Sequence, residues 1–402
     1  MRGRTLKAIT NGKLILPDER GEFQIVEHQA LLYDTLIREI VPEMGIRGDI
    51  RPEVEEIIDA RGAYVSPGFV NIHLHGCVGY DAMDDDAAAL SSMARYQAAT
   101  GVTAMLPTTM TYDFPTIYKA LDHIRTAMAA PGDGAQILGA HMEGPFISVE
   151  RRGAQAPEHI VPADYERIAP YADIIRLITI APEELKGDYT FVEQCQEAGI
   201  TISLGHSSAD YNTARRAILQ YGIDHVTHLF NGMVPFHHRT PGLVGAALDT
   251  PVDCELIADN VHLHPMTQRL VWRMKQGRHI VLITDSMRAC GLGDGESELG
   301  GQVVRVSGQV AALEDGTIAG SVLTLDRAVA NFAANTGAGL AATVSYATKA
   351  PAVSVGVYDQ MGSLEIGKRA DIAIFDGAVR VQRTIIGGRE VYRADGEGKA
   401  GK

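Results

Sequence analysis

The chain has 402 residues, of which 46% are hydrophobic and 21% are charged, and its formal net charge at pH 7 is -14. This size and composition are typical of a globular protein with one large domain and a smaller one. So acidic a chain is not expected to bind nucleic acid or an anionic membrane surface nonspecifically, although it can still contain a local basic pocket for an anionic substrate.

The four cysteines are scattered without a CxxC pair, which indicates reduced and mostly buried thiols. Residues 1–5 contain no apolar signal core, and no apolar run is long enough to cross a bilayer. We therefore expect a cytoplasmic protein with no membrane partner. The tail at residues 393–402 is rich in Gly, Ala and charge, and we expect it to fray.

The first 62 residues predict short strands separated by turns. An Asn11-Gly12 pair between apolar residues predicts a hairpin over residues 8–16. Three further strands are expected at residues 30–33, 36–41 and 54–59.

From residue 69 onward, apolar runs recur at intervals of roughly 25 to 38 residues, each followed by a helix-like stretch. One strand, one helix and two loops fill such an interval. Eight βα units predict a (β/α)8 barrel of the TIM type, and continuous hydrophobic strands fit a parallel sheet covered by helices. The eight runs are residues 69–75, 102–107, 137–143, 175–181, 200–206, 225–230, 254–259 and 279–285.

Residues 300–320 are strand-like and rich in glycine, which predicts a hairpin excursion at the end of the eighth unit. Helices are expected over residues 324–335 and 341–349, with Pro351 ending the second.

Residues 362–375 and the segment after them return to short strands. We expect the strands of the two chain ends to pair into one small β-sandwich domain. The predicted division is therefore residues 1–62 plus 352–395 for the small domain, and residues 63–351 for the catalytic barrel.

His73 and His75 form the most informative local pattern. They lie two residues apart at the end of a predicted strand, so both imidazoles are expected on the same face, where they could bind one transition-metal ion. Taken alone, the pair could equally be two polar residues at the mouth of a strand.

Barrel active sites form at the C-terminal ends of the strands. Side chains of metal-ligand type end six of the eight predicted strands. Any one of them could be a hydrogen-bonded core residue, but together they would converge on one face of the barrel. They are His73 and His75, Glu143, His206, His228, Asp259 with the nearby His262, and Asp285.

Four histidines, a glutamate and an aspartate suit one or two first-row divalent ions, and favour zinc, iron, manganese or cobalt over magnesium. The absence of a thiolate cluster points to a catalytic rather than a structural ion. Such an ion acidifies water and polarises a carbonyl oxygen, and Asp285 could take the proton and pass it to a leaving group. The site therefore predicts hydrolysis of a carbonyl or phosphoryl bond.

Eight segments together match a known family: PGFVNIHLHG (67–76), HMEGPF (141–146), LGHS (204–207), THLFNGM (227–233), RTPG (239–242), IADNVH (257–262), TD (284–285) and IAGS (318–321). Over nearly its whole length the chain resembles the amidohydrolase superfamily, and within it the N-acetylglucosamine-6-phosphate deacetylases. The histidine pair marks only the superfamily. The segment after Glu143 and the segments around Asn231 and Arg239 are typical of the deacetylases.

The resemblance implies a metal centre with six ligands, which are His73, His75, Glu143, His206, His228 and Asp285. Glu143, His206 and His228 would hold the principal ion. His73 and His75 would hold a second ion in members that have this pair, with Glu143 as the bridge. Asp285 would be the general base and acid.

The resemblance also implies a substrate site made of Ala154, Gln155, Asn231, Gly232, Arg239, His262, Ile318, Ala319, Gly320 and Ser321. Ala154, Asn231 and Gly232 would surround the sugar, and residues 318–321 would close over it. Arg239 and His262 would bind the phosphate, in part across a dimer interface. From the residues alone, both could instead be solvated loop side chains.

Two positions depart from the family pattern. Gln155 replaces a histidine that polarises the acetyl carbonyl in some members, and a glutamine can donate a hydrogen bond but cannot become a cation. We hypothesise that a second ion at His73 and His75 takes over this polarisation. Asn260 stands where glycine is common, and asparagine tolerates the left-handed backbone region.

The implied activity is removal of acetate from N-acetylglucosamine 6-phosphate to give glucosamine 6-phosphate, in amino-sugar catabolism and cell-wall sugar recycling. The implied cofactor is one or two divalent ions, zinc first, with iron, manganese or cobalt as alternatives. A homodimer acting on a small amino-sugar phosphate is expected. The alternatives are an N-acetylgalactosamine-6-phosphate deacetylase or related amidohydrolase, and a scaffold that has lost catalysis.

Overall fold

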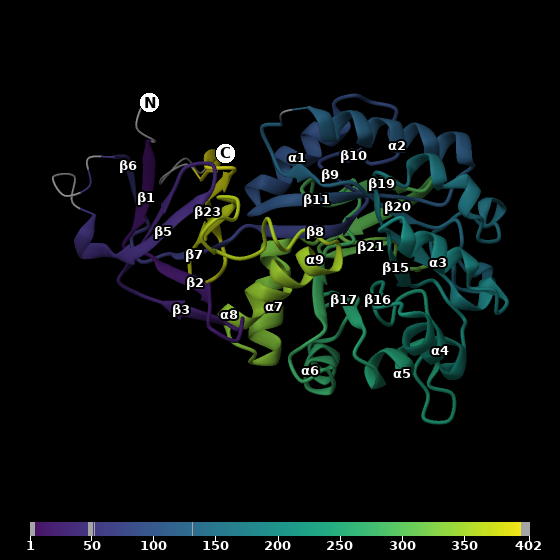
Figure 1. Cartoon of the computed structure of the whole chain (residues 1–402). Helices are drawn as coiled ribbons and strands as arrows, with labels where there is room; N and C mark the ends of the chain where they lie inside the picture. The colour runs from purple at the N-terminus through teal and green to yellow at the C-terminus, as the bar shows by residue number, and fades with distance from the viewer. Residues whose placement is uncertain (1–4, 47–50, 52, 131, 395–402) are drawn as a thin grey trace.

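The computed structural model describes residues 5–46, 51, 53–130 and 132–394. Figure 1 shows a smaller part that contains strands from both ends of the chain, next to a larger barrel. The described residues do not include residues 1–4 or the tail from residue 395. The expectations of a start without a signal core and of a frayed tail concern these residues.

The larger part is a barrel of eight parallel strands. Hydrogen bonds close it: the amide of Asp285 donates to the carbonyl of His73 at 2.9 Å, and Leu74 pairs with Ser286. The predicted (β/α)8 barrel is thus confirmed, and each predicted run contains a strand. The strands are β8 (Phe69–Leu74), β11 (Val102–Thr109), β13 (Ala140–Glu143), β14 (Ile175–Ile180), β15 (Thr201–Leu204), β16 (His225–Val226), β17 (Asp253–Ile257) and β18 (Ile280–Ile283), with β12 (Gln136–Ile137) added beside β11.

The interior of the barrel is lined by hydrogen-bonded polar side chains. His141 Nε2 lies 2.8 Å from Thr179 Oγ1, and Thr179 Oγ1 lies 2.8 Å from Thr227 Oγ1. Thr227 Oγ1 lies in turn 2.5 Å from Ser203 Oγ. All four residues are buried. A buried polar group without a partner costs stability, so this network indicates an interior built to support polar chemistry.

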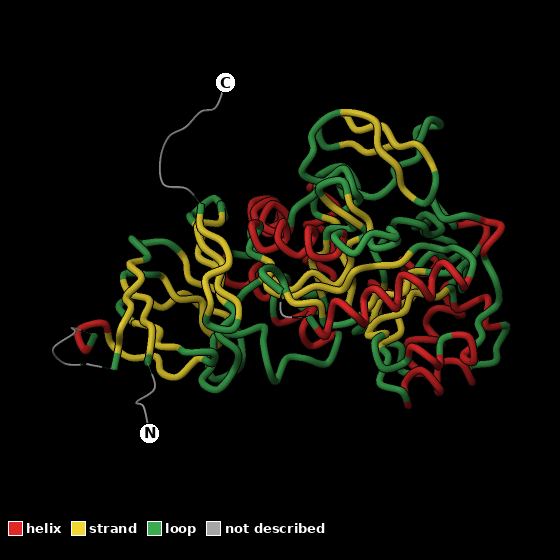
Figure 2. Tube along the Cα trace, turned by 90° about the horizontal axis from the view of Figure 1, so that it is seen from above, coloured by secondary structure: helices red, strands yellow, loops and turns green. Residues whose placement is uncertain are grey.

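Helices surround the barrel and are nearly absent from the small domain (Figure 2). Asp113 and Asp210 begin two of them by accepting hydrogen bonds from the Thr116 and Thr213 amides at 2.9 and 2.7 Å. The helices are α1 (Ala89–Ala99), α2 (Phe114–Ala129), α3 (Thr190–Glu197), α4 (Tyr211–Tyr221), α5 (Gly242–Asp249), α6 (Pro265–Met274), α7 (Leu325–Thr336), α8 (Leu340–Tyr346) and α9 (Lys349–Ser354).

The expectation of a helix after every strand is wrong for the third unit. Residues 144–174, all of them described, form four 3-10 turns between β13 and β14 instead of an α-helix. Pro145, Pro157, Pro162 and Pro170 interrupt this segment, and each lacks the amide that a helix interior requires.

The helices α7 and α8 match the two expected after the excursion, but the role given to Pro351 is wrong. Pro351 does not end a helix; it lies in the first turn of a third one, α9. The missing amide is harmless there because first-turn amides have no partner within the helix.

The excursion after β18 forms a three-stranded antiparallel sheet of β19 (Gly295–Leu299), β20 (Gln302–Ser307) and β21 (Val310–Ala312). It begins before the expected residues 300–320. Leu299 and Val304 from this sheet pack in one apolar cluster with Met110 and Ala154 of the barrel loops. The Gln302 side chain also donates to the Ala154 carbonyl at 2.7 Å. The sheet therefore covers the C-terminal mouth of the barrel.

The small domain is a sandwich of two sheets, as predicted. Ile9 and Leu31 of the first sheet share an apolar core with Leu14, Val65 and Ile374 of the second. In the order in which neighbouring strands pair, the first sheet is β5 (Ile37–Pro42), β4 (Gln29–Tyr33), β1 (Leu6–Thr10) and β6 (Val54–Asp59), and the second is β24 (Arg389–Arg393), β23 (Val381–Ile386), β22 (Ile372–Phe375), β7 (Tyr64–Pro67), β2 (Lys13–Pro17) and β3 (Phe23–Val26).

Strand β22 pairs antiparallel with β7, so the two chain ends meet in one sheet. The division into residues 1–62 plus 352–395 and residues 63–351 stays a proposal. Strand β7 begins just after the first of these boundaries and belongs to the six-stranded sheet.

The hairpin predicted at Asn11-Gly12 is wrong. Strands β1 and β2 are both fully described, and they lie in different sheets. Asn11 has φ 53°, and the turn carries the chain from one sheet to the other. A Cβ on Gly12 would lie 2.7 Å from Val65 Cγ2, so glycine allows the close packing of this crossing.

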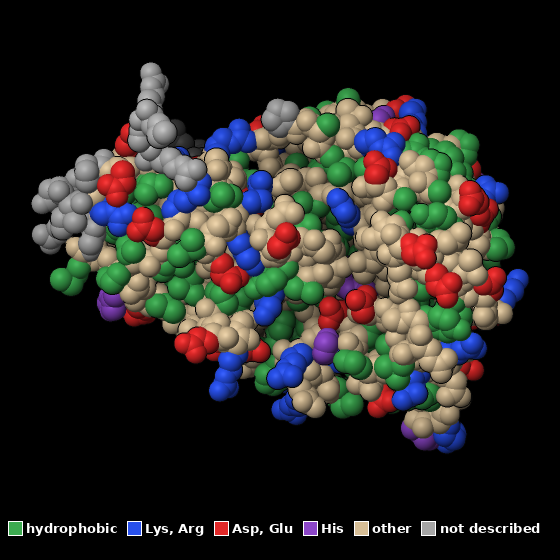
Figure 3. Space-filling model, in the orientation of Figure 1, with side chains coloured by type: hydrophobic (Ala, Val, Ile, Leu, Met, Phe, Trp, Pro, Cys, Tyr) green, Lys and Arg blue, Asp and Glu red, His purple; other side chains and the backbone are tan. Residues whose placement is uncertain are grey.

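No helix in the described part of the chain is both long enough and apolar enough to cross a membrane. Acidic, basic and hydrophobic side chains are interspersed over the face shown in Figure 3. The net charge of -14 is therefore not gathered into a single acidic patch on that face.

Candidate metal centre

The six predicted metal ligands meet at the C-terminal mouth of the barrel. Three of them follow short strands with backbone in the left-handed region, at φ 45° for His206, 27° for His228 and 48° for Asp285. Such angles are uncommon for residues other than glycine, and backbone strain of this kind tends to cluster at active sites. The six are His73 in β8, His75 one residue after it, Glu143 at the end of β13, and His206, His228 and Asp285 two residues after β15, β16 and β18 respectively.

Glu143, His206 and His228 form the first ligand group. Glu143 Oε1 lies 3.2 Å from His206 Nε2 and 3.0 Å from His228 Nε2, and the two nitrogens lie 3.1 Å apart. Ligand atoms about 2.0–2.2 Å from a tetrahedral zinc ion lie about 3.3–3.5 Å from one another. These three atoms therefore form a face of nearly the size that a bound zinc ion requires.

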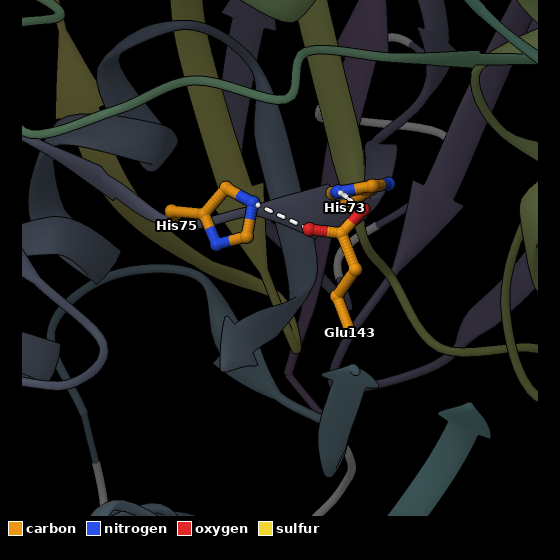
Figure 4. Close-up of side chains that lie close together, drawn as sticks. All are labelled: His73, His75 and Glu143. Carbon is orange, nitrogen blue, oxygen red and sulfur yellow. Dashed lines mark ion pairs between the residues drawn. The ribbon is translucent and has the colours of Figure 1, made fainter. Parts of the chain in front are cut away.

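His73 and His75 form the second group, and both approach the same Glu143 carboxylate (Figure 4). His73 Nε2 lies 3.5 Å from Glu143 Oε1, and His75 Nε2 lies 3.2 Å from Glu143 Oε2. Asp285 Oδ1 lies 3.5 Å from His73 Nε2 and 3.3 Å from His75 Nε2. His73 Nε2 is buried without a hydrogen-bond partner among the described residues, which fits a nitrogen that binds a metal ion.

Hydrogen bonds at Nδ1 direct three of the four imidazoles, whereas His228 Nδ1 is buried without a partner among the described residues. His75 Nδ1 donates to the Thr108 carbonyl at 3.2 Å, and His206 Nδ1 donates to the Arg151 carbonyl at 2.8 Å. An imidazole that donates through Nδ1 presents the Nε2 lone pair to a metal. The donor set and its orientation therefore fit a divalent ion in each group.

Both carboxylates carry charge, although Glu143 is buried and the Asp285 side chain is only 13% exposed. Burial opposes the charge of Glu143, but attraction to His206 and His73 and hydrogen bonds from His206 and His228 hold its pKa well below the usual range. Burial likewise opposes the charge of Asp285, but His73 and His75 lower its pKa. The site thus concentrates negative charge that a bound cation would neutralise.

Above these ligands lies a cavity of about 160 Å³. Its wall includes most of the predicted substrate residues. It also includes Met110, Gly153, Leu299 and Thr317, which the sequence did not indicate. The predicted residues that line it are His75, Glu143, Ala154, Gln155, His206, His228, Asn231, Gly232, His262, Asp285, Ile318, Ala319 and Gly320.

The sequence model of the amidohydrolase family matches residues 64–391. The chain belongs to the amidohydrolase family. It is 37% identical over 349 residues to the N-acetylglucosamine-6-phosphate deacetylase of Bacillus subtilis (strain 168), covering 85% of this chain and 88% of that protein. It is 36% identical over 351 residues to the N-acetylgalactosamine-6-phosphate deacetylase of Escherichia coli O157:H7, covering 86% and 92%. The crystal structure of the N-acetylglucosamine-6-phosphate deacetylase from Pasteurella multocida matches with a TM-score of 0.88 and 29% identity, covering 96% of this chain and 99% of that one.

Gln155 in this amidohydrolase is held against the shared ligand. Its Oε1 accepts from the Thr111 amide at 2.7 Å, and its Nε2 donates to Glu143 Oε2 at 2.8 Å. The side chain is buried at the cavity wall. Its contacts thus connect it to Glu143, and its predicted role toward the substrate stays a prediction.

Three residues that were predicted to bind the phosphate or to close over the substrate differ in their position relative to the cavity. His262 lines the cavity, and its Nδ1 lies 2.6 Å from Asp259 Oδ2. Ser321 is buried behind the wall, where its Oγ donates to the Thr284 carbonyl at 2.5 Å. Arg239 is exposed beside His238 and lies outside the cavity of this chain, on the loop between β16 and α5 that extends away from the barrel (Figure 1).

His141, which was left out of the predicted ligand set, packs edge-on against His73 with ring centroids 4.5 Å apart. Burial and the charge of His73 lower the pKa of His141 to about 3. His141 is therefore neutral, and its hydrogen-bonded ring packs against the His73 ring and limits the movement of that ring.

Glu255 in β17 was missed. It is fully buried and lies 2.9 Å from His73 Nδ1 and 3.2 Å from His225 Nε2. Burial opposes its charge, but attraction to His73 and the hydrogen bond from His225 hold the pKa of Glu255 well below the usual range. The signal was a single carboxylate within an apolar strand, at a position that faces the barrel interior.

Ion binding is expected to release protons and to strengthen as the pH rises. Burial opposes protonation of His228, but the hydrogen bond and charge of Glu143 raise its pKa in the ion-free protein to about 9. At pH 7 this imidazole therefore carries a proton that an ion must displace, and the raised pKa of His75 acts in the same direction, so affinity rises as the pH increases from 7 toward 9. Calorimetric zinc titrations of EDTA-treated protein, in buffers with different ionisation enthalpies, count the protons released. His279→Gln, outside the centre, should release the same number; binding without proton release would contradict the expectation.

Proposed function

We propose that the protein is a metal-dependent deacetylase that hydrolyses N-acetylglucosamine 6-phosphate to acetate and glucosamine 6-phosphate, in amino-sugar catabolism and cell-wall sugar recycling. The observation that carries the proposal is the pair of ligand groups sharing Glu143 in a cavity whose wall includes Asn231 and Gly232 from a segment typical of deacetylases. The relatives named N-acetylglucosamine-6-phosphate deacetylase support the choice of substrate.

The proposed cofactor is one or two divalent ions, zinc first and iron, manganese or cobalt as alternatives. Glu143, His206 and His228 would hold the principal ion, and His73 and His75 the second, with Asp285 beside these two histidines. When bound, a divalent ion lowers the pKa of water and polarises the carbonyl oxygen.

Asp285 is the proposed general base and acid. Its carboxylate lines the cavity and is ionised, so it can accept a proton as water attacks the amide carbon. The new C–O bond forms while the C–N bond breaks, and protonated Asp285 returns its proton to the departing amine nitrogen. Water thus supplies the oxygen of the acetate, and no other reactant is needed.

The cavity wall would hold the sugar and bring its amide to the ligands. Ala154, Asn231 and Gly232 line the cavity together with residues 318–320, which would close over the sugar. Asp259 fixes the His262 ring through Nδ1, which leaves Nε2 for the substrate phosphate. Such remote contacts orient the amide and lower the barrier without taking part in the chemistry.

Arg239 supports a homodimer. It projects outside the cavity of its own chain, so it would complete a phosphate site only in a neighbouring copy. An arginine fork is the strongest single donor for a phosphate in an acidic protein. We propose that the protein is a cytoplasmic homodimer in which each copy supplies Arg239 to the other.

A second candidate is an N-acetylgalactosamine-6-phosphate deacetylase, because the Escherichia coli relative of that name is almost as similar. The two substrates differ at one hydroxyl. A scaffold without catalysis would be expected to lose metal ligands, whereas all six are present here and are brought together.

Acetate release from both sugar phosphates, measured with the metal content of the same sample, tests the proposal. N-acetylglucosamine 6-phosphate should be hydrolysed faster than N-acetylgalactosamine 6-phosphate. Asp285→Asn should lower kcat about 100-fold to 10,000-fold because the base is lost. The metal content of this variant should stay near normal. Asp253→Asn changes the first residue of β17, at the end of the strand away from the barrel mouth, and serves as the control. Preference for the galactosamine substrate would favour the second candidate, and full activity of Asp285→Asn would refute its role.

Arg239→Ala should lower kcat/KM about tenfold to hundredfold for the phosphorylated substrate, because a hydrogen bond to a charged group contributes about 1.5–3 kcal/mol. Unphosphorylated N-acetylglucosamine should be hydrolysed as by the parent. Arg380→Ala removes an exposed arginine of the small domain and is the matched control. An equal loss on both substrates would remove Arg239 from the phosphate site.

A further inference from the structure

A buried carboxylate beneath the metal centre contacts one ligand of each group. Glu255 Oε2 accepts from His73 Nδ1 at 2.9 Å and from the His228 amide at 3.1 Å. Glu255 Oε1 lies 3.2 Å from His225 Nε2. Glu255 and His225 do not line the cavity, so neither is placed to touch the substrate.

The contact with His73 determines which nitrogen that ring offers. A carboxylate accepts a hydrogen bond from Nδ1–H, so Nε2 keeps its lone pair. That nitrogen is buried, without a partner among the described residues, and lies 3.5 Å from both Glu143 and Asp285. The His141 ring, packed edge-on against His73, further restricts its rotation.

The contact with His228 fixes a strained turn. His228 has φ 27°, and the following Leu229 amide donates to the Glu255 carbonyl at 2.9 Å. Two adjacent amides of this turn thus bind the side chain and the backbone of one residue. A ligand in an unfavourable backbone conformation needs such restraint to keep its position.

We propose that Glu255 is a positioning residue whose charge sets the affinity of His73 and His75 for the second ion. A carboxylate on the far side of a histidine raises the basicity of the ligating nitrogen and fixes its tautomer, and such partners change metal affinity about tenfold to hundredfold. The principal ion depends on Glu255 only through the His228 amide, which needs an acceptor but no full charge. The inference rests on the proposed metal centre and not on the identity of the sugar.

The surroundings of Glu255 allow its charge to be removed without loss of its hydrogen bonds. In Glu255→Gln, the amide oxygen can take the place of Oε2 and accept from His73 and the His228 amide. The amide nitrogen would then donate to His225 Nε2. His225 can accept it because Nδ1, which lacks a partner within the described chain, can carry the ring proton instead. Glu255→Leu removes both the charge and the hydrogen bonds.

The experiment titrates EDTA-treated protein with Co²⁺ and follows the visible absorption of each bound ion together with the heat of binding. We expect two steps for the parent. Glu255→Gln should weaken the second step about tenfold to hundredfold and the first by less than about twofold, and Glu255→Leu should lose the second step. Thr384→Val, which removes a buried hydrogen bond to the Ala98 carbonyl without touching a ligand or the barrel network, is the control and should match the parent.

Thermal unfolding of the ion-free proteins separates positioning from a structural role. Glu255→Gln should unfold near the parent temperature, since its hydrogen bonds are kept. Two parent-like binding steps in Glu255→Gln would overturn the inference, as would equal weakening of both steps together with a lower unfolding temperature. A parent that binds fewer than two ions would instead contradict the two-ion form of the proposed function, and the role of Glu255 with it.

Discussion

Two ionised carboxylates held largely away from water at the mouth of one barrel are the constraint on which the rest of the structure depends. Glu143 is buried and the Asp285 side chain is only 13% exposed, and removing charge from water is costly unless opposite charge and hydrogen bonds surround it. Four imidazoles from three strand ends supply the donors, and divalent ions would supply the charge. This requirement explains why His206 and His228 accept left-handed backbone angles in order to point inward.

The same constraint extends below the ligands. Below the ligands, side chains of the barrel interior form a chain of hydrogen bonds that runs from His141 to Thr179, Thr227 and Ser203. Buried polar networks of this kind fix positions only when every member has a partner. The roof, residues 317–320, comes instead from the loop that follows β21. Ligand positions thus rest on the rigid part of the fold, and substrate cover rests on a loop.

Local signals predicted the barrel and its ligands because strand alternation and strand ends are local properties. His73 and His75 share a face by alternation alone. Long-range contacts could not be predicted in this way. The Asn-Gly turn at Asn11 has the same local sequence whether its strands pair or separate into two sheets. Glu255 is 182 positions from His73, and only the closed barrel brings their side chains to 2.9 Å.

The contacts of Gln155 give a physical basis for its association with the histidine pair. Glu143 is shared by both ligand groups, and Gln155 donates to its Oε2, the atom that also faces His75. A histidine there could become a cation and repel two ions bound to the same carboxylate. A neutral amide satisfies the oxygen without adding positive charge. A site with His73 and His75 in place therefore favours a glutamine at this position on electrostatic grounds, whichever group polarises the carbonyl.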